Sequence, residues 1–266
     1  MVHSLIDIGA NIAHDSFDDD RADMMRRAKD AGVSRIIVTG SSDESNVLAA
    51  ELAEKSPGVL YSTAGVHPHH ASGYDDASDT LIRTLIQKDV VVAVGECGLD
   101  YFRNLSPRKA QLEAFARQLE IAMDSGLPVF LHQRDAHDDF VELLEPALPN
   151  LSRAVAHCFT GEGESLREYV AMGLYIGITG WICDERRGGH LQDIVSIIPD
   201  DRLLLETDAP YLLPRTIRPK PKSRRNEPMY LPEIVRVVAE ARGQTEQHIA
   251  DITYANSVRF FALNRD

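Results

Sequence analysis

The stretch VVVAVGECGLDY, Val90 to Tyr101, opens with an uninterrupted apolar run that ends at Gly95 and Glu96. Such a run is typical of a strand that is covered on both faces, as in the parallel sheets of α/β proteins. The strand leads directly into a carboxylate, and burying a carboxylate is costly unless a partner compensates its charge. The stretch therefore predicts a parallel sheet and a charged partner for Glu96.

Similar short apolar runs recur along the chain, separated by segments with helical spacing of apolar residues. They are LIDIG, RIIVTG, LYSTAGVHP, LPVFLH, RAVAHCF, LYIGITG and RLLLETD. The spacing matches one strand plus one helix. Eight such units in 266 residues favour a closed (β/α)8 TIM barrel of the metal-dependent hydrolase type, with an open doubly wound sheet as the alternative. No low-complexity linker divides the chain, so we expect a single domain over residues 1–266.

Several of the intervening helices have recognisable ends. Ser106 and Pro107 predict an N-cap and a first helical position, and Gly126 predicts the end of the same helix. Helices are also predicted over residues 44–55, 164–173, 231–243 and 245–263, the last two after the eighth strand.

The composition indicates a soluble protein. No apolar run is long enough to span a membrane, and the N-terminus lacks the pattern of a signal peptide. The three cysteines, Cys97, Cys158 and Cys183, form no CxxC pair, which favours a reducing, cytoplasmic setting. A net charge of −13 argues against nonspecific binding of nucleic acid unless the basic residues gather in one place. Nothing in the pattern requires more than a monomer.

Polar side chains end most of the predicted strands. These residues are Asp7, His67, Glu96, His132, His157 and Asp208. In a parallel barrel the carboxyl ends of the strands meet at one rim, so we expect these side chains to converge. Imidazoles and carboxylates together suit Mg²⁺, Mn²⁺ or Zn²⁺. A bound cation would offset the cost of burying Glu96 and generate a hydroxide nucleophile, which is typical of a hydrolase.

Several other residues lie next to these strand ends. Cys97 and Cys158 directly follow strand-end residues, so alternation along a strand predicts that both side chains turn away toward the helices. Arg134 holds a substrate phosphate or pairs with a neighbouring acid. His69 and His70 extend a loop and are expected to be solvated.

A basic segment follows the last strand. RTIRPKPKSRRNEP, Arg215 to Pro228, carries its cations at Arg215, Arg218, Lys220, Lys222, Arg224 and Arg225. Its prolines keep it extended. Cations beside a hydrolytic metal would attract a polyanion such as a single strand of nucleic acid, and the alternative is a solvated or internally paired loop. Nearby aromatic residues (Tyr101, Phe102, Trp181 and Tyr211) stack bases or only pack the loops.

The motifs STAGVHPHH, GECGLDY, PVFLHQRDAH, AHCFTG, YIGITGW, ETDAPYLLP and SRRNEP occur in this order over nearly the whole chain. Together they resemble the TatD family of metal-dependent deoxyribonucleases, and GWICDERRG resembles the TatD branch. The resemblance implies a TIM barrel that binds a divalent metal, usually Mg²⁺. For the TatD branch it implies a 3′→5′ exonuclease of single-stranded DNA and RNA that is linked to DNA repair or degradation.

The resemblance also implies residue roles. Glu96, His132 and His157 would bind the metal, and Asp208 would bind it or activate the attacking water. His67 would lie near the phosphate or the metal.

The chain departs from the family in its first strand. Much of the family has two metal-binding histidines there, where this chain has Gly9 and Asn11. We therefore expect one firmly bound metal and a second that binds weakly or arrives with substrate.

The predicted function is metal-dependent hydrolysis of DNA phosphodiester bonds. In this interpretation Asp208, Glu96 and His67 are catalytic, and His67, Arg134, Arg224 and Arg225 bind the substrate. A metal-dependent amidohydrolase or acyl-ester hydrolase is the alternative among enzymes, because one barrel serves several chemistries. A nucleic-acid-binding protein with a decayed metal site is the alternative of another class.

Overall fold

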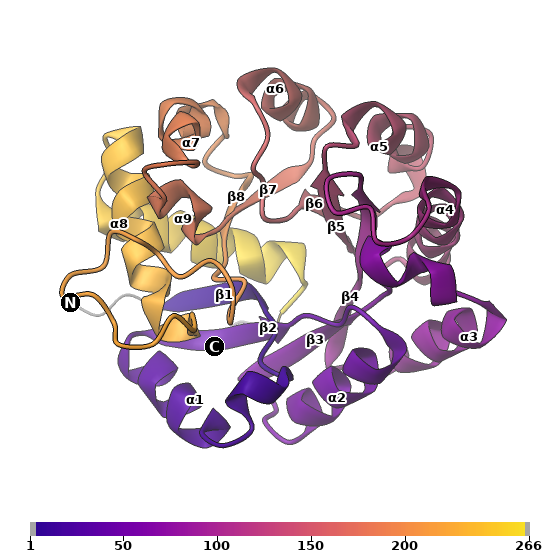
Figure 1. Ribbon diagram of the computed structural model, residues 1–266, viewed down its shortest axis with the longest axis horizontal. Coiled ribbons are helices and arrows are strands. Elements are labelled where there is room, and N and C mark those ends of the chain that lie inside the picture. Colours follow the sequence, from indigo (N-terminus) through magenta and orange to yellow (C-terminus); the bar gives the residue numbers. More distant parts are fainter. Residues whose placement is uncertain (1–3, 264–266) are drawn as a thin grey trace.

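The computed structural model, which describes residues 4–263, contains one sheet of parallel strands in which each strand pairs with the next along the chain (Figure 1). All eight strands lie at the predicted runs, so the predicted TIM barrel is confirmed. They are β1 (Leu5–Ala10), β2 (Val33–Val38), β3 (Leu60–Ala64), β4 (Val91–Asp100), β5 (Val129–Arg134), β6 (Ala154–Ala156), β7 (Tyr175–Ile178) and β8 (Leu203–Leu205).

Helices surround the sheet on its outer face (Figure 1). The α-helices are α1 (Arg21–Asp30), α2 (Asp43–Glu54), α3 (Asp76–Leu85), α4 (Arg108–Ser125), α5 (His137–Leu144), α6 (Gly163–Ala171), α7 (Gly189–Ile194), α8 (Leu231–Arg242) and α9 (Glu246–Phe260). Short 3-10 helices are η1 (Asp15–Phe17), η2 (Pro68–Gly73), η3 (Leu148–Asn150), η4 (Gly180–Cys183), η5 (Val195–Ile197) and η6 (Pro228–Tyr230). None of the helices within residues 4–263 is long and apolar enough to cross a membrane.

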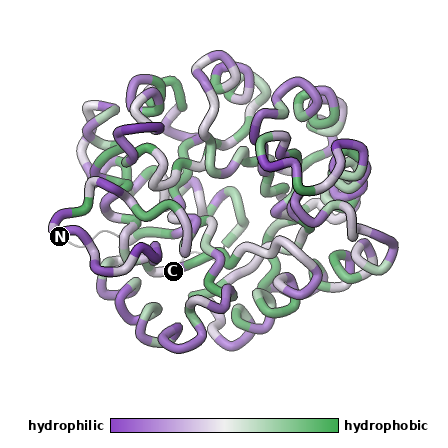
Figure 2. Tube along the Cα trace, in the orientation of Figure 1, coloured by the Kyte–Doolittle hydropathy of each residue, from purple (hydrophilic) through white to green (hydrophobic). Residues whose placement is uncertain are grey.

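Two apolar layers hold the barrel together. A larger cluster fills the space between the strands and the surrounding helices, and a smaller one includes Ile8, Phe130 and Leu204 from the strands. The end of the chain joins the smaller cluster through Phe260 and Phe261, so α9 helps to cover this core. Figure 2 shows the corresponding pattern, with apolar segments inside and hydrophilic segments on the outer faces of the helices.

The seam between β1 and β8 closes through polar contacts. The backbone N–H of Asp208 donates to the carbonyl of Gly9 at 2.8 Å. The carboxylate of Asp7 accepts from the backbone N–H of Thr207 at 2.9 Å and from its hydroxyl at 2.5 Å. Burial raises the pKa of Asp7 to about 7. Asp7 therefore fixes the end of β8, and its carboxylate does not join the other strand-end residues as its position suggested.

The predicted helices are all present, and only the start of α4 departs from its predicted cap. Gly126 ends α4 in a left-handed conformation with φ of 70°, as predicted. The helix begins at Arg108 with Pro107 at the N-cap position, so the prediction of Ser106 as the N-cap is wrong. The hydroxyl of Ser106 instead donates to the carbonyl of His69 and accepts from the N–H of Ser72, both at 3.0 Å. Ser106 thus fastens the loop that carries the site histidines.

A single domain over residues 1–266 stays a prediction, because residues 1–3 and 264–266 lie outside the described part of the chain.

Candidate metal centre and active site

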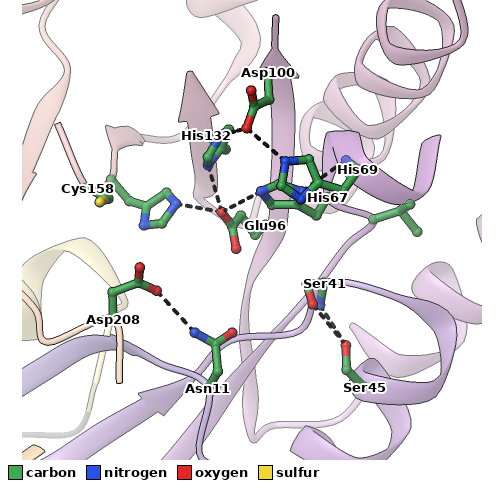
Figure 3. Close-up of polar contacts among 12 residues, drawn as sticks. Asn11, Ser41, Ser45, His67, His69, Glu96, Asp100, His132, Cys158 and Asp208 are labelled. Atoms are coloured by element: carbon green, nitrogen blue, oxygen red, sulfur yellow. Dashed lines mark hydrogen bonds and ion pairs between the residues drawn. The ribbon is translucent and has the colours of Figure 1, made fainter. Parts of the chain in front are cut away.

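The carboxylate of Glu96 lies buried at the centre of three imidazoles (Figure 3). Its Oε1 atom is 2.7 Å from Nε2 of His157, 3.0 Å from Nδ1 of His132 and 3.3 Å from Nε2 of His67. Glu96 lies on β4 and His132 on β5, His157 directly follows β6, and His67 lies in the loop after β3. These four residues therefore converge at one rim of the barrel, as expected.

A second carboxylate, Asp100, extends the cluster, and the sequence analysis missed it. Its Oδ2 atom is 2.8 Å from Nε2 of His69 and 3.3 Å from Nε2 of His132. Residues four apart on a strand face the same side, so Glu96 and Asp100 of β4 point into the same cavity. The spacing in GECGLD would have predicted this placement if the strand had been extended past Gly95. His69 is therefore part of the site, whereas a solvated loop position was expected.

Asp208 follows β8 and lines the cavity together with Asn11 (Figure 3). The side-chain amide of Asn11 donates to Oδ1 of Asp208 at 3.1 Å. Burial, together with the nearby carboxylates of Glu96 and Glu206, raises the pKa of Asp208 to about 8. The carboxyl group is therefore protonated at neutral pH unless a cation or a substrate stabilises its charge.

Glu206 lies behind His157, and the sequence analysis missed it as well. It is fully buried, with one carboxylate oxygen 3.3 Å from Nδ1 of His157 and the other accepting from the N–H of Cys158 at 2.5 Å. A Cβ atom at Gly9 would lie 2.2 Å from the Glu206 carboxylate. The absence of a side chain at position 9 of the first strand therefore leaves room for Glu206.

The cysteines behave differently from each other. Cys97 is buried in the larger apolar cluster, as expected. Cys158 lines the cavity instead of packing toward the helices. The expectation for Cys158 is wrong because β6 ends at Ala156 and Cys158 has a left-handed conformation with φ of 45°, so alternation along a strand no longer applies.

The charges in the cluster stabilise one another. Burial raises the pKa of Glu96, but the interactions with His157, His67 and His132 are stronger. The pKa of Glu96 is therefore held well below its usual range. Burial lowers the pKa of His157, but Glu96 and Glu206 outweigh it and hold it well above its usual range. Glu96 and His157 therefore form a buried ion pair within the cluster.

The donor set fits a divalent cation. One ligand atom each from His67, Glu96 and His132 lies within 4.8 Å of the others. Nε2 of His157 faces the same Glu96 oxygen, and its Nδ1 faces Glu206. A metal-bound imidazole whose second nitrogen contacts a carboxylate is a common arrangement in metalloproteins. The mixture of imidazoles and carboxylates suits Zn²⁺, Mn²⁺ or Mg²⁺.

The cluster lies at the base of a cavity of about 850 Å³, within the range of ligand-binding cavities. Arg134 lines its wall and faces the same side of β5 as His132. Its guanidinium lies 4.0 Å from the ring centre of Phe102 and 5.4 Å from that of Trp181. Within residues 4–263 no acid pairs with Arg134, so the structure favours the substrate-facing interpretation over an internal ion pair.

The basic segment divides into paired and unpaired cations. Arg225 contacts Asp20 at 2.7 Å and Glu227 at 2.8 Å, and its guanidinium lies over the ring of Phe17. Arg225 is absent from the cavity lining, and its guanidinium is taken up by these contacts within the chain. Arg224, by contrast, lines the cavity. Among the described side chains none forms an ion pair or hydrogen bond with that of Arg224.

Comparisons with known proteins agree with this geometry. The family model described as TatD related DNase matches residues 6–262. The protein named 3′-5′ ssDNA/RNA exonuclease TatD from Erwinia billingiae is 51% identical over 259 residues, which cover 97% of this chain and 99% of that protein.

Two solved structures have the same fold over their full length. A TatD-family hydrolase from Entamoeba histolytica has a TM-score of 0.89 at 27% identity, covering 99% of this chain and 100% of that chain. A TatD homologue from Escherichia coli K12 has a TM-score of 0.88 at 30% identity, with the same coverage. The chain therefore belongs to the TatD-related DNase family, a family of metal-dependent nucleases.

Proposed function

We propose that this nuclease removes nucleotides from the 3′ end of single-stranded DNA, with RNA as a second substrate, and that it acts in DNA repair or degradation. The single observation that carries the chemistry is the buried carboxylate of Glu96 at the centre of three imidazoles. The choice of strand and direction is supported by the relatives named 3′-5′ ssDNA/RNA exonuclease, such as the one from Erwinia billingiae.

We propose Mg²⁺ as the cation, with Mn²⁺ or Zn²⁺ as substitutes. Glu96, His132, His157 and Asp208 would hold it. When bound, the cation supplies a hydroxide nucleophile near neutral pH and polarises the scissile phosphate. Asp208 would also orient or deprotonate the attacking water, once the cation has displaced the proton that its raised pKa retains near neutral pH.

The tautomer of His67 distinguishes it from the proposed ligands. Its Nδ1 atom accepts the backbone N–H of His69 at 3.0 Å, so a neutral ring carries its proton on Nε2. Burial lowers the pKa of His67 to about 4, so the ring is neutral at pH 7. Nε2 can then donate to a phosphate oxygen but has no free lone pair for a metal. This favours a phosphate-binding role, although His67 lies close enough to Glu96 and His132 to complete a geometric ligand set.

The first strand supports one firm metal site. Gly9 offers no ligand, and the amide of Asn11 already contacts Asp208. We propose one firm site at Glu96, His132, His157 and Asp208, and a second, weaker site that fills with substrate. The assembled imidazoles and carboxylates disfavour a decayed metal site.

We further propose a cytoplasmic monomer. The three free cysteines fit a reducing setting, and the sequence pattern requires no second chain.

Digestion of end-labelled oligonucleotides tests the proposal. The purified protein should shorten 5′-labelled single strands stepwise in Mg²⁺, act poorly on blunt duplexes and stop in EDTA. A 3′-terminal phosphorothioate linkage should delay the ladder, whereas the same linkage at the 5′ end should not. Immediate release of the 5′ label, or undiminished cleavage in EDTA, would contradict the proposal.

A further inference from the structure

The mouth of the metal cavity exposes large apolar side chains. Phe102 is 56% exposed, Leu105 is 67% exposed and Tyr211 is 52% exposed, and all three line the cavity. The other large hydrophobic residues with comparable exposure among residues 4–263 are Val47, Leu48 and Val59, which do not line it. Both exposed aromatic rings therefore lie at the site, and exposed apolar groups gathered at a cavity indicate a ligand that covers them.

The two aromatic residues lie on opposite sides of the cavity. Phe102 follows β4 and Tyr211 follows β8, which are half a turn apart in the ring of strands (Figure 1). Phe102, Tyr211 and the cluster around Glu96 all line the same cavity. A phosphodiester at the metal would therefore have one ring on each side.

The wall at Phe102 also presents hydrogen-bond donors. The guanidinium of Arg134 stacks on the Phe102 ring at 4.0 Å and reaches the Trp181 ring at 5.4 Å. Stacking holds the guanidinium plane in place while its edge keeps N–H groups available, since no described residue pairs with it. This wall offers an apolar face and a cation to the same ligand.

The wall at Tyr211 adjoins the unpaired part of the basic segment. The edge-on ring of His14, with its centre 6.0 Å from that of Tyr211, packs beside it. Arg224 lines the same cavity, and Lys220 and Lys222 are exposed and near Arg224 in the sequence. None of these three cations forms an ion pair within the described residues. These cations could neutralise successive phosphates of a bound nucleic-acid strand.

We propose that Phe102 and Tyr211 are two base-stacking platforms for the last two nucleotides of a single strand, with the scissile phosphate between them. This inference rests on the proposed nuclease function and deepens it. The base of the leaving 3′ nucleotide stacks on Phe102, and Arg134 donates to its phosphate. The preceding base stacks on Tyr211, from which the rest of the strand runs along the basic segment.

The arrangement explains a preference for single strands. A base within a duplex has its faces covered by its neighbours and its edge paired, so it offers no free face to a protein ring. Two rings on opposite sides of the metal require two unstacked bases. A duplex end must therefore fray by two pairs before it is cut.

Position-specific removal of bases tests the inference. The probes are 5′-labelled single strands with an abasic residue at the 3′-terminal, the penultimate or a distant position, each measured for kcat/KM in Mg²⁺. With the unmodified protein, an abasic residue at either of the last two positions should reduce kcat/KM by about tenfold or more, and at the distant position by much less.

The variants assign each base to a ring. Phe102→Ala should lower kcat/KM on the intact strand by about tenfold. Removing the terminal base should then lower kcat/KM no further, whereas removing the penultimate base should still lower it. Tyr211→Ala should show the opposite pattern. Both side chains are more than half exposed, so their removal does not threaten the fold. Phe102→Tyr should restore the activity because the flat ring is retained, whereas Phe102→Leu should not. Leu48→Ala removes an exposed apolar side chain outside the cavity and serves as the matched control.

The outcomes separate the two hypotheses. A protein that cleaves no single strand in Mg²⁺ contradicts the proposed function. A protein that cleaves them, but whose sensitivity to missing bases does not change in Phe102→Ala and Tyr211→Ala, contradicts only the stacking inference. If Phe102→Ala loses its sensitivity to the penultimate base and Tyr211→Ala loses its sensitivity to the terminal base, the strand runs in the opposite direction. That result would overturn the assignment of the terminal base to Phe102.

Discussion

The Nε2 atom of His157 lies 2.7 Å from the Oε1 atom of Glu96, although the two residues are 61 positions apart in the sequence. Both are buried, and each stabilises the charge of the other. The two side chains therefore form a buried ion pair.

Metal binding should release protons from this site. Glu96 and Glu206 hold the pKa of His157 well above its usual range, and burial raises the pKa of Asp208 to about 8. Both groups carry protons at pH 7, and a cation binds only their unprotonated forms. The affinity for Mn²⁺ should thus rise between pH 6 and 8, by about tenfold per pH unit for each proton displaced.

Calorimetric titration at pH 7 in buffers of different ionisation enthalpy measures the number of protons released. At least one is expected, and Asp208→Asn should reduce it. A heat of binding that is the same in all buffers would refute the assignment of these groups as ligands.

Removing the charge of Glu96 should abolish catalysis without unfolding the barrel. Glu96→Ala and the isosteric Glu96→Gln are both expected to lower kcat/KM by roughly 1000-fold or more, because each removes the only charge that the three imidazoles share. The far-ultraviolet circular dichroism spectrum should stay unchanged. Glu96→Gln with activity near that of the unmodified protein would show that the charge is dispensable.

Arg224 and Arg225 form a matched pair for separating substrate binding from stability. Arg225→Ala loses contacts with Asp20 and Glu227, so the free energy of unfolding should fall by about 2 kcal/mol. Arg224→Ala should leave stability unchanged, raise KM severalfold and lower the salt dependence of substrate binding by about one charge. Chemical denaturation and binding at several salt concentrations check both. Equal effects of the two substitutions on KM would contradict their different placement.

The acid range gives an independent check on Arg225. Hydrogen bonds from Arg225 and Arg27 lower the pKa of Asp20 to about 2. A lowered pKa stabilises the folded state above pH 4, and this contribution is lost as the pH falls from about 4 to about 2. Arg225→Ala should therefore lose less stability over this interval than the unmodified protein does. An identical loss would mean that Arg225 does not hold the Asp20 carboxylate.

Glu206 should position His157 for metal binding. Glu206→Gln places an amide where a carboxylate faces Nδ1 of His157, which favours the ring tautomer with its proton on Nε2. The affinity for Mn²⁺ should fall by about 10- to 100-fold. Glu168→Gln is the control, since Glu168 contacts His137 at 2.8 Å outside the metal cavity and should leave the affinity unchanged. Unchanged affinity in Glu206→Gln would leave Glu206 with a packing role only.

The sequence was informative where the signal is local. Apolar runs such as that of β4 predicted all eight strands, because burial on both faces leaves no polar position to confuse the pattern. Glu96, His132 and His157 could be recognised because each follows or ends such a run, and the fold itself brings strand ends together.

Other features depend on contacts that no local pattern encodes. Arg225 contacts Asp20 and Glu227 only in the closed barrel. The sequence therefore could not show which cations of the basic segment are paired within the chain. Glu206 was not recognised because its partner, His157, follows a different strand. Cys158 was misplaced because strand alternation was extended past the end of β6.

Anomalous diffraction from crystals soaked in Mn²⁺ would show whether the Glu96 cluster holds the catalytic metal. The strongest anomalous peak should lie within coordination distance of the Glu96 carboxylate and of imidazole nitrogens of His132 and His157, with Asp208 beside it. A protein that Mn²⁺ activates, yet whose manganese peak lies away from Glu96, would contradict the proposed metal site.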